Sequence, residues 1–581
     1  MNFMSNERKS IQQVPEIIGL EVVSLDALRA AMKMLLCSIP LTGILLIGGC
    51  NSHQQEERKA SQESVSSQST SKNVRANRIL RRGLPGEPRT LDPQLADDEF
   101  SFQVLRDLFE GLTAEDAHGR TIPGVARSWS VSNDGTVYSF VLRRTAKWSD
   151  GSPVTASEFV NALRRAVDPR TGSSSAELLE TVKGAPAIIA GKADVNSLGV
   201  SAVGQNIVRI ELTRPAPFIL QVLSQPIAAP LRFGGNGASL SSPHNFQPAI
   251  SDGPFVLVKR VYGSYIDIVR NREYWDAAHI SINRVRYVIA ESEATELREY
   301  MAGQLDITYS IPLPDLRRMI AENPSEVQMA PILATFYLAA NMTESRLRDD
   351  IDLRQALSMA VDRRLISEKI MLGVTPAYSF VPPRVRNYIP PEYPWAQWPR
   401  QQRLDFARKL FTHAGYSNIH PLHLRLYFNS DETIKRVMVA IAGSWAQNLG
   451  VITKLTSDEF RVFLNRRRDH SRWDFVRLGW TADYDDPASF LEVFAHDSPQ
   501  NDASYKSAIF NDLINAARSE SSNKSRINKL ERAESVLLND YAVIPIYFYE
   551  ARRMVKPYVG GASITPLNRT YSKYLFWKDA P

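Results

Sequence analysis

The stretch LHLRLYFNSDETIKRVMVAIAGSWAQNLGVITKL, residues 422–455, decides the fold class. Apolar residues alternate strictly with other residues over 422–428, which is typical of a half-buried strand. Over 431–449 the apolar residues follow helical spacing, and Gly450 is typical of a helix C-terminus. A second strand is expected over 451–455. A strand, a helix and a strand in this order predict an α/β domain.

Elements of both classes recur along the rest of the chain. We expect strands over 137–143 and 542–549, and helices over 156–167 and 400–414. Thr155 is a suitable N-cap for the helix at 156–167, and Glu158 would complete a capping box. Pro545 lacks a backbone N–H and therefore predicts an edge position or a bulge in the last of these strands.

The composition is that of a soluble globular protein with two to four domains. The 581 residues exceed the size of a single core, and 44% hydrophobic and 23% charged residues are ordinary values. A net charge of +6 over this length is mild. The basic run at 466–468 is short and ends at Asp469, so no stripe of cations and aromatics predicts nucleic-acid binding.

The N-terminal segment has the features of an export signal and of a lipid attachment site. Residues 32–50, MKMLLCSIPLTGILLIGGC, place Lys33 before an apolar run that is too short for a membrane span. The run ends in Ile-Gly-Gly-Cys, which resembles a bacterial lipobox with Cys50 as the lipid acceptor. We therefore expect a lipoprotein signal peptide over 1–50, in which residues 1–31 are an extra extension if translation starts at Met32. Residues 51–78 are rich in Ser, Gln and Asn and predict a disordered tether.

Motifs for catalysis are absent from the sequence. It contains no phosphate-binding G-x-x-x-x-G-K-[ST], no H-E-x-x-H and no G-x-S-x-G. The only cysteines are Cys37 and Cys50, so the folded body has no thiol nucleophile, disulfide or cysteine metal ligand. We expect a binding protein without a cofactor or metal; a hydrolase would need a nucleophile with a base, or a metal site.

Several motifs together carry a family resemblance. They are RDLFEGL at 106–112, PGVARSW at 123–129, KWSDGSPVTASEFVNALRR at 147–165, LRQALSMAVDR at 353–363 and GWTADYDDP at 479–487. In this order they resemble the peptide-binding branch of the family 5 solute-binding proteins of ABC importers, over nearly all of 79–581. The resemblance implies a receptor in the periplasm or cell envelope, which as a monomer delivers short peptides with a free N-terminus to a permease and its ATPase subunits.

The implied fold is a mixed α/β, bilobed periplasmic-binding-protein fold with an additional small domain, closing on its ligand as a hinge. Lobe I would consist of residues 79–109, 231–333 and 551–581. Lobe II would cover 110–230, and lobe III 334–550. The ligand cleft would lie between the lobes.

The resemblance also implies which charged residues bind the ligand. Asp483 occupies the position of the aspartate that pairs with the α-ammonium group of the peptide, and in a closed cleft of low dielectric such a pair is strong. Arg477 matches an arginine that helps to meet the carboxylate end. Asp97 aligns, within one residue, with an acidic residue that contributes to closure over the ligand.

The residues between the two charges are expected to bind the peptide backbone. Leu478, Gly479 and Trp480 would offer backbone groups to an extended peptide, as in β-strand addition. Gly479 lets the two backbones come close, and Trp480 would supply an apolar wall. Tyr484 belongs to the same stretch and completes the set of candidate ligand-binding residues.

Departures from the family pattern leave the ligand partly open. Two cysteines that form a disulfide in some relatives are replaced, together, near Ala334 and at Thr481. A tyrosine that flanks the ligand is replaced near Ser175, and a histidine used for some peptide lengths falls near 433–434. Peptide length is therefore open, and haem, a metal chelate or a murein peptide are alternative ligands for the same fold.

Overall fold

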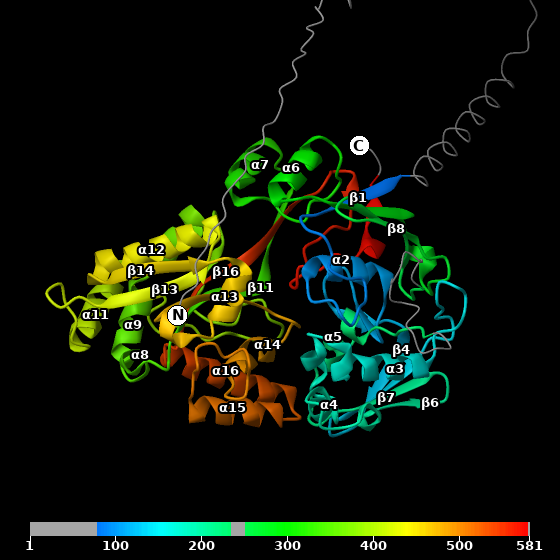
Figure 1. Ribbon diagram of the computed structural model, residues 1–581, viewed down its shortest axis with the longest axis horizontal. Helices are drawn as coiled ribbons and strands as arrows, with labels where there is room; N and C mark the ends of the chain where they lie inside the picture. The colour runs from blue at the N-terminus through cyan, green and yellow to red at the C-terminus, as the bar shows by residue number, and fades with distance from the viewer. Residues whose placement is uncertain (1–77, 234–249, 579–581) are drawn as a thin grey trace, which may run out of the picture. The chain divides into compact units, whose positions relative to one another are not determined.

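The computed structural model describes residues 78–233 and 250–578 (Figure 1). The predicted signal peptide, Cys50 and nearly all of the tether lie outside the described residues. Among the helices that are described, none is long and apolar enough to cross a membrane.

The largest sheet has six strands and contains the stretch at 422–455. Its order is β12 (Thr375–Pro376), β16 (Val543–Met554), β11 (Val327–Ala340), β15 (Phe475–Thr481), β13 (His423–Asn429) and β14 (Ile452–Asp458). Strand β13 runs parallel to β14 and β15, whereas β15, β11, β16 and β12 pair antiparallel.

Two four-stranded sheets and two small ribbons complete the described β structure. One sheet has the order β1 (Ile79–Leu84), β10 (Arg284–Ile289), β9 (Tyr265–Arg270), β8 (Phe255–Val261). The other has the order β4 (Ala126–Val131), β5 (Val137–Leu142), β7 (Ile207–Glu211), β6 (Val200–Val203). The ribbons pair β2 (Thr113–Glu115) with β3 (Thr121–Pro123), and β17 (Val559–Gly560) with β18 (Phe576–Trp577).

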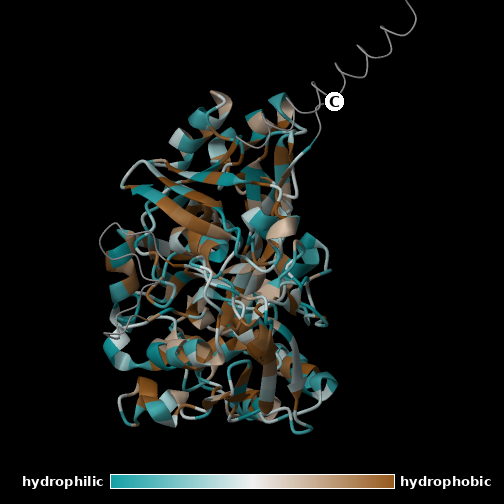
Figure 2. Cartoon of the chain, turned by 90° about the vertical axis from the view of Figure 1, so that its right-hand side faces the viewer, coloured by the Kyte–Doolittle hydropathy of each residue, from teal (hydrophilic) through white to brown (hydrophobic). Residues whose placement is uncertain are grey.

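Helices cover the sheets. They are α2 (Glu99–Leu108), α3 (Ala156–Val167), α4 (Ala185–Ile189), α5 (Ile219–Val222), α6 (Glu293–Met301), α7 (Leu316–Glu322), α8 (Ser345–Arg348), α9 (Ile351–Ala360), α10 (Arg363–Leu365), α11 (Arg400–His413), α12 (Glu432–Leu449), α13 (Phe460–Arg466), α14 (Ala488–Leu491), α15 (Ala508–Arg518) and α16 (Asn523–Asn539). Figure 2 shows hydrophobic residues concentrated on the inner strands and hydrophilic residues along outer loops and helices.

The predicted strand–helix–strand unit is confirmed. Strands β13 and β14 are parallel neighbours connected by α12. The Asp431 side chain caps this helix by accepting a hydrogen bond from the Ile434 N–H at 2.8 Å. Gly450 ends it in the left-handed region at φ 72°, which glycine adopts without strain. Local residues therefore set both ends of the helix.

The other predicted elements are also present, with small shifts at their ends. The Glu158 carboxylate accepts the Thr155 backbone N–H at 2.8 Å, so α3 begins at the predicted cap. Strand β16 is longer than predicted and lies inside the sheet. Its register against β11 shifts between the pairs Phe336–Tyr547 and Tyr337–Pro545, so the bulge predicted for Pro545 is confirmed.

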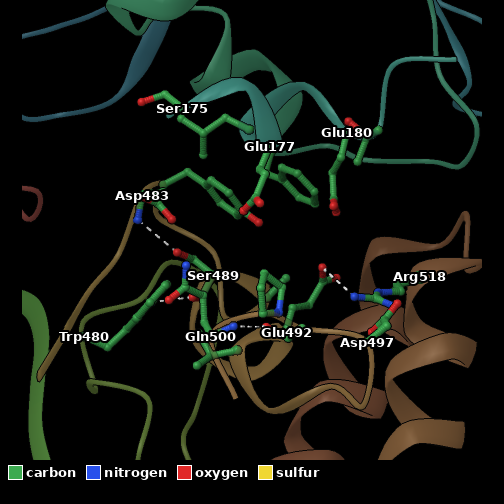
Figure 3. A pocket seen from close by; sticks show the side chains of 18 of the residues that line it. Ser175, Glu177, Glu180, Trp480, Asp483, Ser489, Glu492, Asp497, Gln500 and Arg518 are labelled. Carbon is green, nitrogen blue, oxygen red and sulfur yellow. Dashed lines mark hydrogen bonds and ion pairs between the residues drawn. The ribbon is translucent and has the colours of Figure 1, made fainter. Parts of the chain in front are cut away.

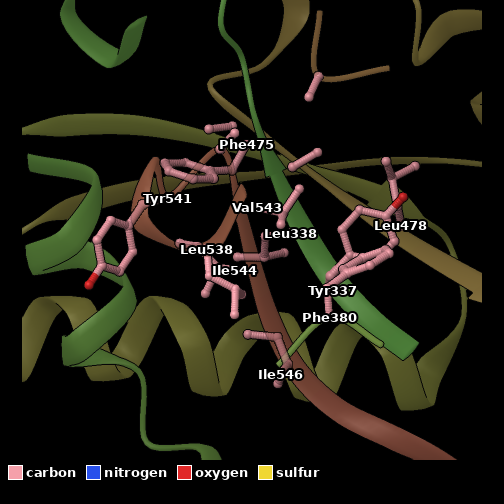
Figure 4. Packing of buried hydrophobic residues seen from close by; sticks show 14 of the residues in the cluster. Tyr337, Leu338, Phe380, Phe475, Leu478, Leu538, Tyr541, Val543, Ile544 and Ile546 are labelled. Atoms are coloured by element: carbon pink, nitrogen blue, oxygen red, sulfur yellow. The ribbon is translucent and has the colours of Figure 1, made fainter. Parts of the chain in front are cut away.

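The large sheet holds the largest hydrophobic core. There Tyr337 of β11 meets the ring of Phe380 edge-on, with ring centroids 4.9 Å apart. Figure 4 shows these rings packed beside residues of β15 and β16. A second core gathers residues 112–228, and a third gathers residues of the β1–β10–β9–β8 sheet with the C-terminal segment. The second core also includes Tyr484, which therefore ties the loop after β15 to a distant part of the chain.

These three cores, which are three of the four hydrophobic clusters among the described residues, serve below as labels for the predicted lobes. Lobe III corresponds to the core around β11, lobe II to the core within 112–228, and lobe I to the core around β1. The lobe boundaries stay predictions, and we use the lobe names below for these three cores.

Candidate ligand-binding site

Two cavities share β15 as a wall, and the loop after β15 lines the first of them. The first, which we call the acidic cavity, has a volume of about 310 Å³, and Trp480, Asp483 and Tyr484 line it. The second, which we call the strand-edge cavity, has a volume of about 430 Å³ and is lined by residues 477–479. The structure thus brings the predicted residues of this stretch together along one strand and one loop, but on two cavities.

The Asp483 carboxylate lines the acidic cavity without a hydrogen-bond or ion-pair partner among the described residues. Its backbone is held firmly: the N–H donates to Ser489 Oγ, and the C=O accepts from Gln225 Nε2 and Arg569 Nη2, each at 2.9 Å. Burial raises the pKa of Asp483 to about 6, opposed in part by the charge of Arg569. The backbone thus aims a half-buried, unpaired carboxylate at the cavity.

Tyr484 has a packing role as well as a place in the cavity wall. Its ring stacks on that of Phe218, with centroids 4.4 Å apart and planes 5° apart. Burial raises the pKa of Tyr484 well above its ordinary value, so the phenol stays neutral. This stack joins the β15 loop to lobe II directly beside Asp483.

Arg477 presents a cation to the strand-edge cavity. Its Nη1 donates to Asn429 Oδ1 at 3.1 Å and its Nη2 donates to Tyr549 Oη at 2.8 Å. The guanidinium lies 4.8 Å from the ring centre of Phe336. No carboxylate in the described part of the chain forms an ion pair with it, so its positive charge is available to an anionic ligand group.

The backbone of β15 has a free edge between these two charges. Strand β11 pairs with β15 from Phe475 to Thr481 on one edge, but β13 pairs with the other edge only at Phe475 and Val476. From 477 to 481 this second edge has no strand partner among the described residues. Unpaired peptide groups on such an edge can accept an added strand.

Leu478 differs from its two neighbours on β15 because its side chain is not available to a ligand. That side chain is buried, with the residue only 4% exposed, and it packs in the largest hydrophobic core. Gly479 is exposed, whereas Trp480 is half-buried and lines the acidic cavity. The Leu478 side chain therefore belongs to the core, and the predicted role of this residue, binding through its backbone, stays a prediction.

Asp97 lies apart from these residues. Its exposed carboxylate pairs with Arg89 at 3.0 Å, and it lines neither cavity. The neighbouring Asp98 caps α2 by accepting the Ser101 N–H at 2.9 Å, and Glu99 pairs with Arg106. None of these three acidic residues lines either cavity, so the role of Asp97 in closure stays a prediction.

The wall of the acidic cavity that faces Asp483 comes from lobe II, and sequence reasoning missed it. Residues within 174–181 form it together with Phe218, and Glu177 and Glu180 extend from it toward the opposite side (Figure 3). These carboxylates lie on a short 3₁₀ turn and the residue after it, where no periodicity or motif marks them. Ser175, where the resemblance places a replaced tyrosine, is also part of this wall.

The other departures from the family pattern have clear positions. Ala334 and Thr481 are direct register partners on β11 and β15, so two cysteines there would face each other across neighbouring strands. Residues 433–434 lie in the first turn of α12 and line neither cavity.

A cavity between two lobes, an unpaired carboxylate and a guanidinium beside a free strand edge together define a protein that binds a small solute. A family comparison agrees: the model of the bacterial extracellular solute-binding proteins, family 5 (middle region), matches residues 120–502. The chain belongs to this family.

Similar proteins cover most of the chain. The periplasmic oligopeptide-binding protein OppA of Salmonella typhimurium is 36% identical over 510 residues, which are 86% of this chain and 92% of OppA. The periplasmic murein peptide-binding protein MppA of Escherichia coli is 34% identical over 503 residues, 86% of this chain and 93% of MppA. The solved structure of Haemophilus influenzae OppA in complex with RPPGFSPFR has a TM-score of 0.72 and 30% identity, covering 86% of this chain and 99% of that one. The predicted bilobed, mixed α/β fold is confirmed by these neighbours.

Proposed function

We propose that this protein is the extracytoplasmic receptor of an ABC importer that captures short peptides in a closing cleft and delivers them to the permease. The observation that carries the proposal is the Asp483 carboxylate, which lines a cavity between lobes without a cation partner among the described residues. Membership of a solute-binding family and similarity to proteins named for oligopeptide and murein peptide binding support it.

Asp483, Arg477 and residues 478–480 each have a role in this proposal. The Asp483 carboxylate accepts hydrogen bonds from the α-ammonium group of the peptide, and the Arg477 guanidinium meets its carboxylate. Residues 478–480 bind the peptide backbone through the free edge of β15, so that recognition depends little on side-chain identity. Trp480 supplies an apolar wall, while its Nε1 donates to the Ser489 C=O at 2.6 Å and stays satisfied.

The sequence spacing of the two charges gives an upper bound on the span of the site. Asp483 lies six positions after Arg477, which is at most about 20 Å at the rise of an extended chain. The reach of the arginine side chain shortens this span, so the site suits peptides of about three to five residues.

Binding calorimetry with a free and an N-acetylated tetrapeptide tests the proposal. Acetylation removes the ammonium charge and leaves the Asp483 carboxylate unpaired, which costs about 3–5 kcal/mol, or about two to four decades in affinity. Equal affinities for the two peptides would refute this role of Asp483. Native mass spectrometry of the freshly purified protein identifies any ligand that co-purifies; haem or a metal chelate there would favour the alternative ligands instead.

Transport rather than catalysis is the expected activity. Peptides incubated with the protein should be recovered intact, and cleavage products would contradict this. Asp97 remains a candidate for closure over the ligand; Asp97→Asn should weaken peptide binding if the Arg89 ion pair gives way to a contact with lobe II.

The proposed location is the periplasm or cell envelope, with a lipid anchor at Cys50. Several acyl chains on one cysteine, at about 0.8 kcal/mol per buried CH₂, would hold the protein firmly on a membrane. Cys50→Ala should move the protein from the membrane fraction to the soluble fraction and abolish incorporation of labelled palmitate. Unchanged fractionation would argue against the anchor.

A further inference from the structure

The acidic cavity carries more negative charge than one ammonium group can neutralise. Five carboxylates line it: those of Glu177, Glu180, Asp483, Glu492 and Asp497. Among the described residues of this lining, Arg518 is the only one with a cationic side chain. Figure 3 shows Glu177 and Glu180 extending from lobe II toward the wall that carries Glu492.

Two arginines form ion pairs with three of these carboxylates. Arg518 pairs with Glu492 and with Asp497, each at 3.3 Å. Arg214 approaches Glu492 at 3.4 Å and Glu180 at 3.6 Å. Of these ion pairs, only Arg214–Glu492 links lobe II to lobe III, along one side of the cavity.

Glu177 and Asp483 keep no cation within the part of the chain that the structure describes. Asp483 is the half-buried, unpaired carboxylate described above, and on the proposed function it receives the α-ammonium group. Glu177 faces the cavity from the other lobe and remains unpaired after that. Burial and the charge of Glu492 raise the pKa of Glu180, so an added cation would relieve repulsion there as well.

Apolar surface accompanies these charges. Trp480, Leu178 and Val493 belong to the same lining. A lysine or arginine side chain can lay its aliphatic stem along such surface and direct its charged end to a carboxylate. An acidic surface that is only exposed to solvent gains nothing from a neighbouring aromatic side chain. A pocket that binds a long cationic side chain needs both carboxylates and apolar surface.

Resting on the proposed function, we propose that the acidic cavity selects short peptides with a lysine or arginine side chain near their N-terminus. Glu177 is the specificity-determining residue that pairs with the side-chain cation. The charge of Glu180 makes the electrostatic potential around Glu177 more negative. Asp483 binds the N-terminus of the peptide, and the lobe II carboxylates then interact with the charge on the peptide side chain next to it.

The experiment compares Lys-Lys-Lys with Ala-Ala-Ala, both with free N-termini, by calorimetry at low and high salt. We expect the purified protein to bind tri-lysine about tenfold more tightly than tri-alanine at about 0.02 M salt. The preference should shrink at about 0.5 M salt, where charges are screened beyond about 4–5 Å. Spermidine, which has amines but no peptide backbone, should bind more weakly than tri-lysine.

Glu177→Gln should remove most of the preference for tri-lysine over tri-alanine, measured as the ratio of the two affinities. The Glu177 side chain is exposed, so the variant should fold normally, which its melting temperature checks. Glu291→Gln removes the same charge at an exposed position before α6 and should keep the preference.

Equal affinities for the two tripeptides, a preference that survives in Glu177→Gln, or tighter binding of spermidine would each overturn the inference while the peptide receptor function stands. Binding of neither tripeptide would overturn the proposed function, and this inference with it.

Discussion

Burial raises the pKa of Asp483 to about 6, so this carboxylate changes charge close to neutral pH. A protonated carboxyl group cannot form an ion pair with an ammonium group. The affinity for a free-N-terminus peptide should therefore be constant above about pH 7 and fall as the pH drops through 6, approaching tenfold per pH unit. Calorimetry between pH 5 and pH 8 measures this. Asp483→Asn should bind weakly at every pH, and a wild-type affinity that stays level down to pH 5 would contradict the assignment.

The same raised pKa predicts a gain in stability when the charge is removed. Because the pKa is higher in the folded state than its ordinary value of 3.8, the ionised carboxylate costs stability above about pH 6 and nothing below about 3.8. Asp483→Asn should stabilise the ligand-free protein by about 1–2 kcal/mol at pH 8, after allowance for screening in the open cavity, and by less at pH 5. Scanning calorimetry at both pH values measures the difference. A variant that melts below the wild type at pH 8 would show that Asp483 has a structural partner.

At the scale of one element, β15 acts through its backbone. A Cβ added at Gly479 would lie 3.0 Å from Tyr549 Oη, so a branched side chain there would fill part of the strand-edge cavity. Gly479→Val should weaken peptide binding at least about tenfold and lower stability by about 1 kcal/mol, because Tyr549 must shift to make room for the added Cβ. Titration with a tetrapeptide measures this.

Thr481→Val is the matched control for that variant. Thr481 lies on the same strand and lines the same cavity, and valine has its shape. Affinity should stay within about threefold, because the hydroxyl is not needed by an added strand. If both variants bind like the wild type, the free edge of β15 is not the peptide platform.

Elements whose ends are marked by their own residues were predictable from the sequence. Asp431 and Gly450 delimit α12 because a side-chain cap and a left-handed glycine act within a few residues. The bulge at Pro545 follows from its missing N–H. Asp483 and Arg477 were predictable only through the family resemblance, because nothing in the local pattern distinguishes them from solvated charges.

The lobe II wall could not be predicted in this way. Glu177, Phe218 and Gln221 lie near the β15 loop through contacts between residues far apart in the sequence, and the partners share no pattern. Asp97 shows a second limit of sequence-based prediction. Its alignment with the acidic residue of the relatives was uncertain by one position, and the neighbouring Asp98 and Glu99 are used for helix capping and for an ion pair.

On the scale of the whole molecule, hydrogen bonds between lobe II and the β15 loop hold the two sides of the acidic cavity together. Gln221 Nε2 donates to the Asp485 C=O at 3.2 Å, and the Asp485 N–H donates to Gln221 Oε1 at 2.7 Å. Gln225 Nε2 donates to the Asp483 C=O at 2.9 Å. Gln221 does not line the acidic cavity, so it can influence binding only through the arrangement of the lobes.

Gln221→Ala should therefore shift the lobes toward separation and speed the release of bound peptide. Loss of two hydrogen bonds, at about 0.5–1.5 kcal/mol each, corresponds to a rise in the dissociation rate of about five- to a hundredfold, with little change in the association rate. Stopped-flow fluorescence follows this through Trp480, which lines the cavity. Gln304→Ala, at an exposed position after α6, should leave both rates unchanged. If Gln221→Ala releases peptide at the wild-type rate, the lobes are held by the Phe218–Tyr484 stack and the Arg214–Glu492 ion pair instead, because these contacts join the same two sides.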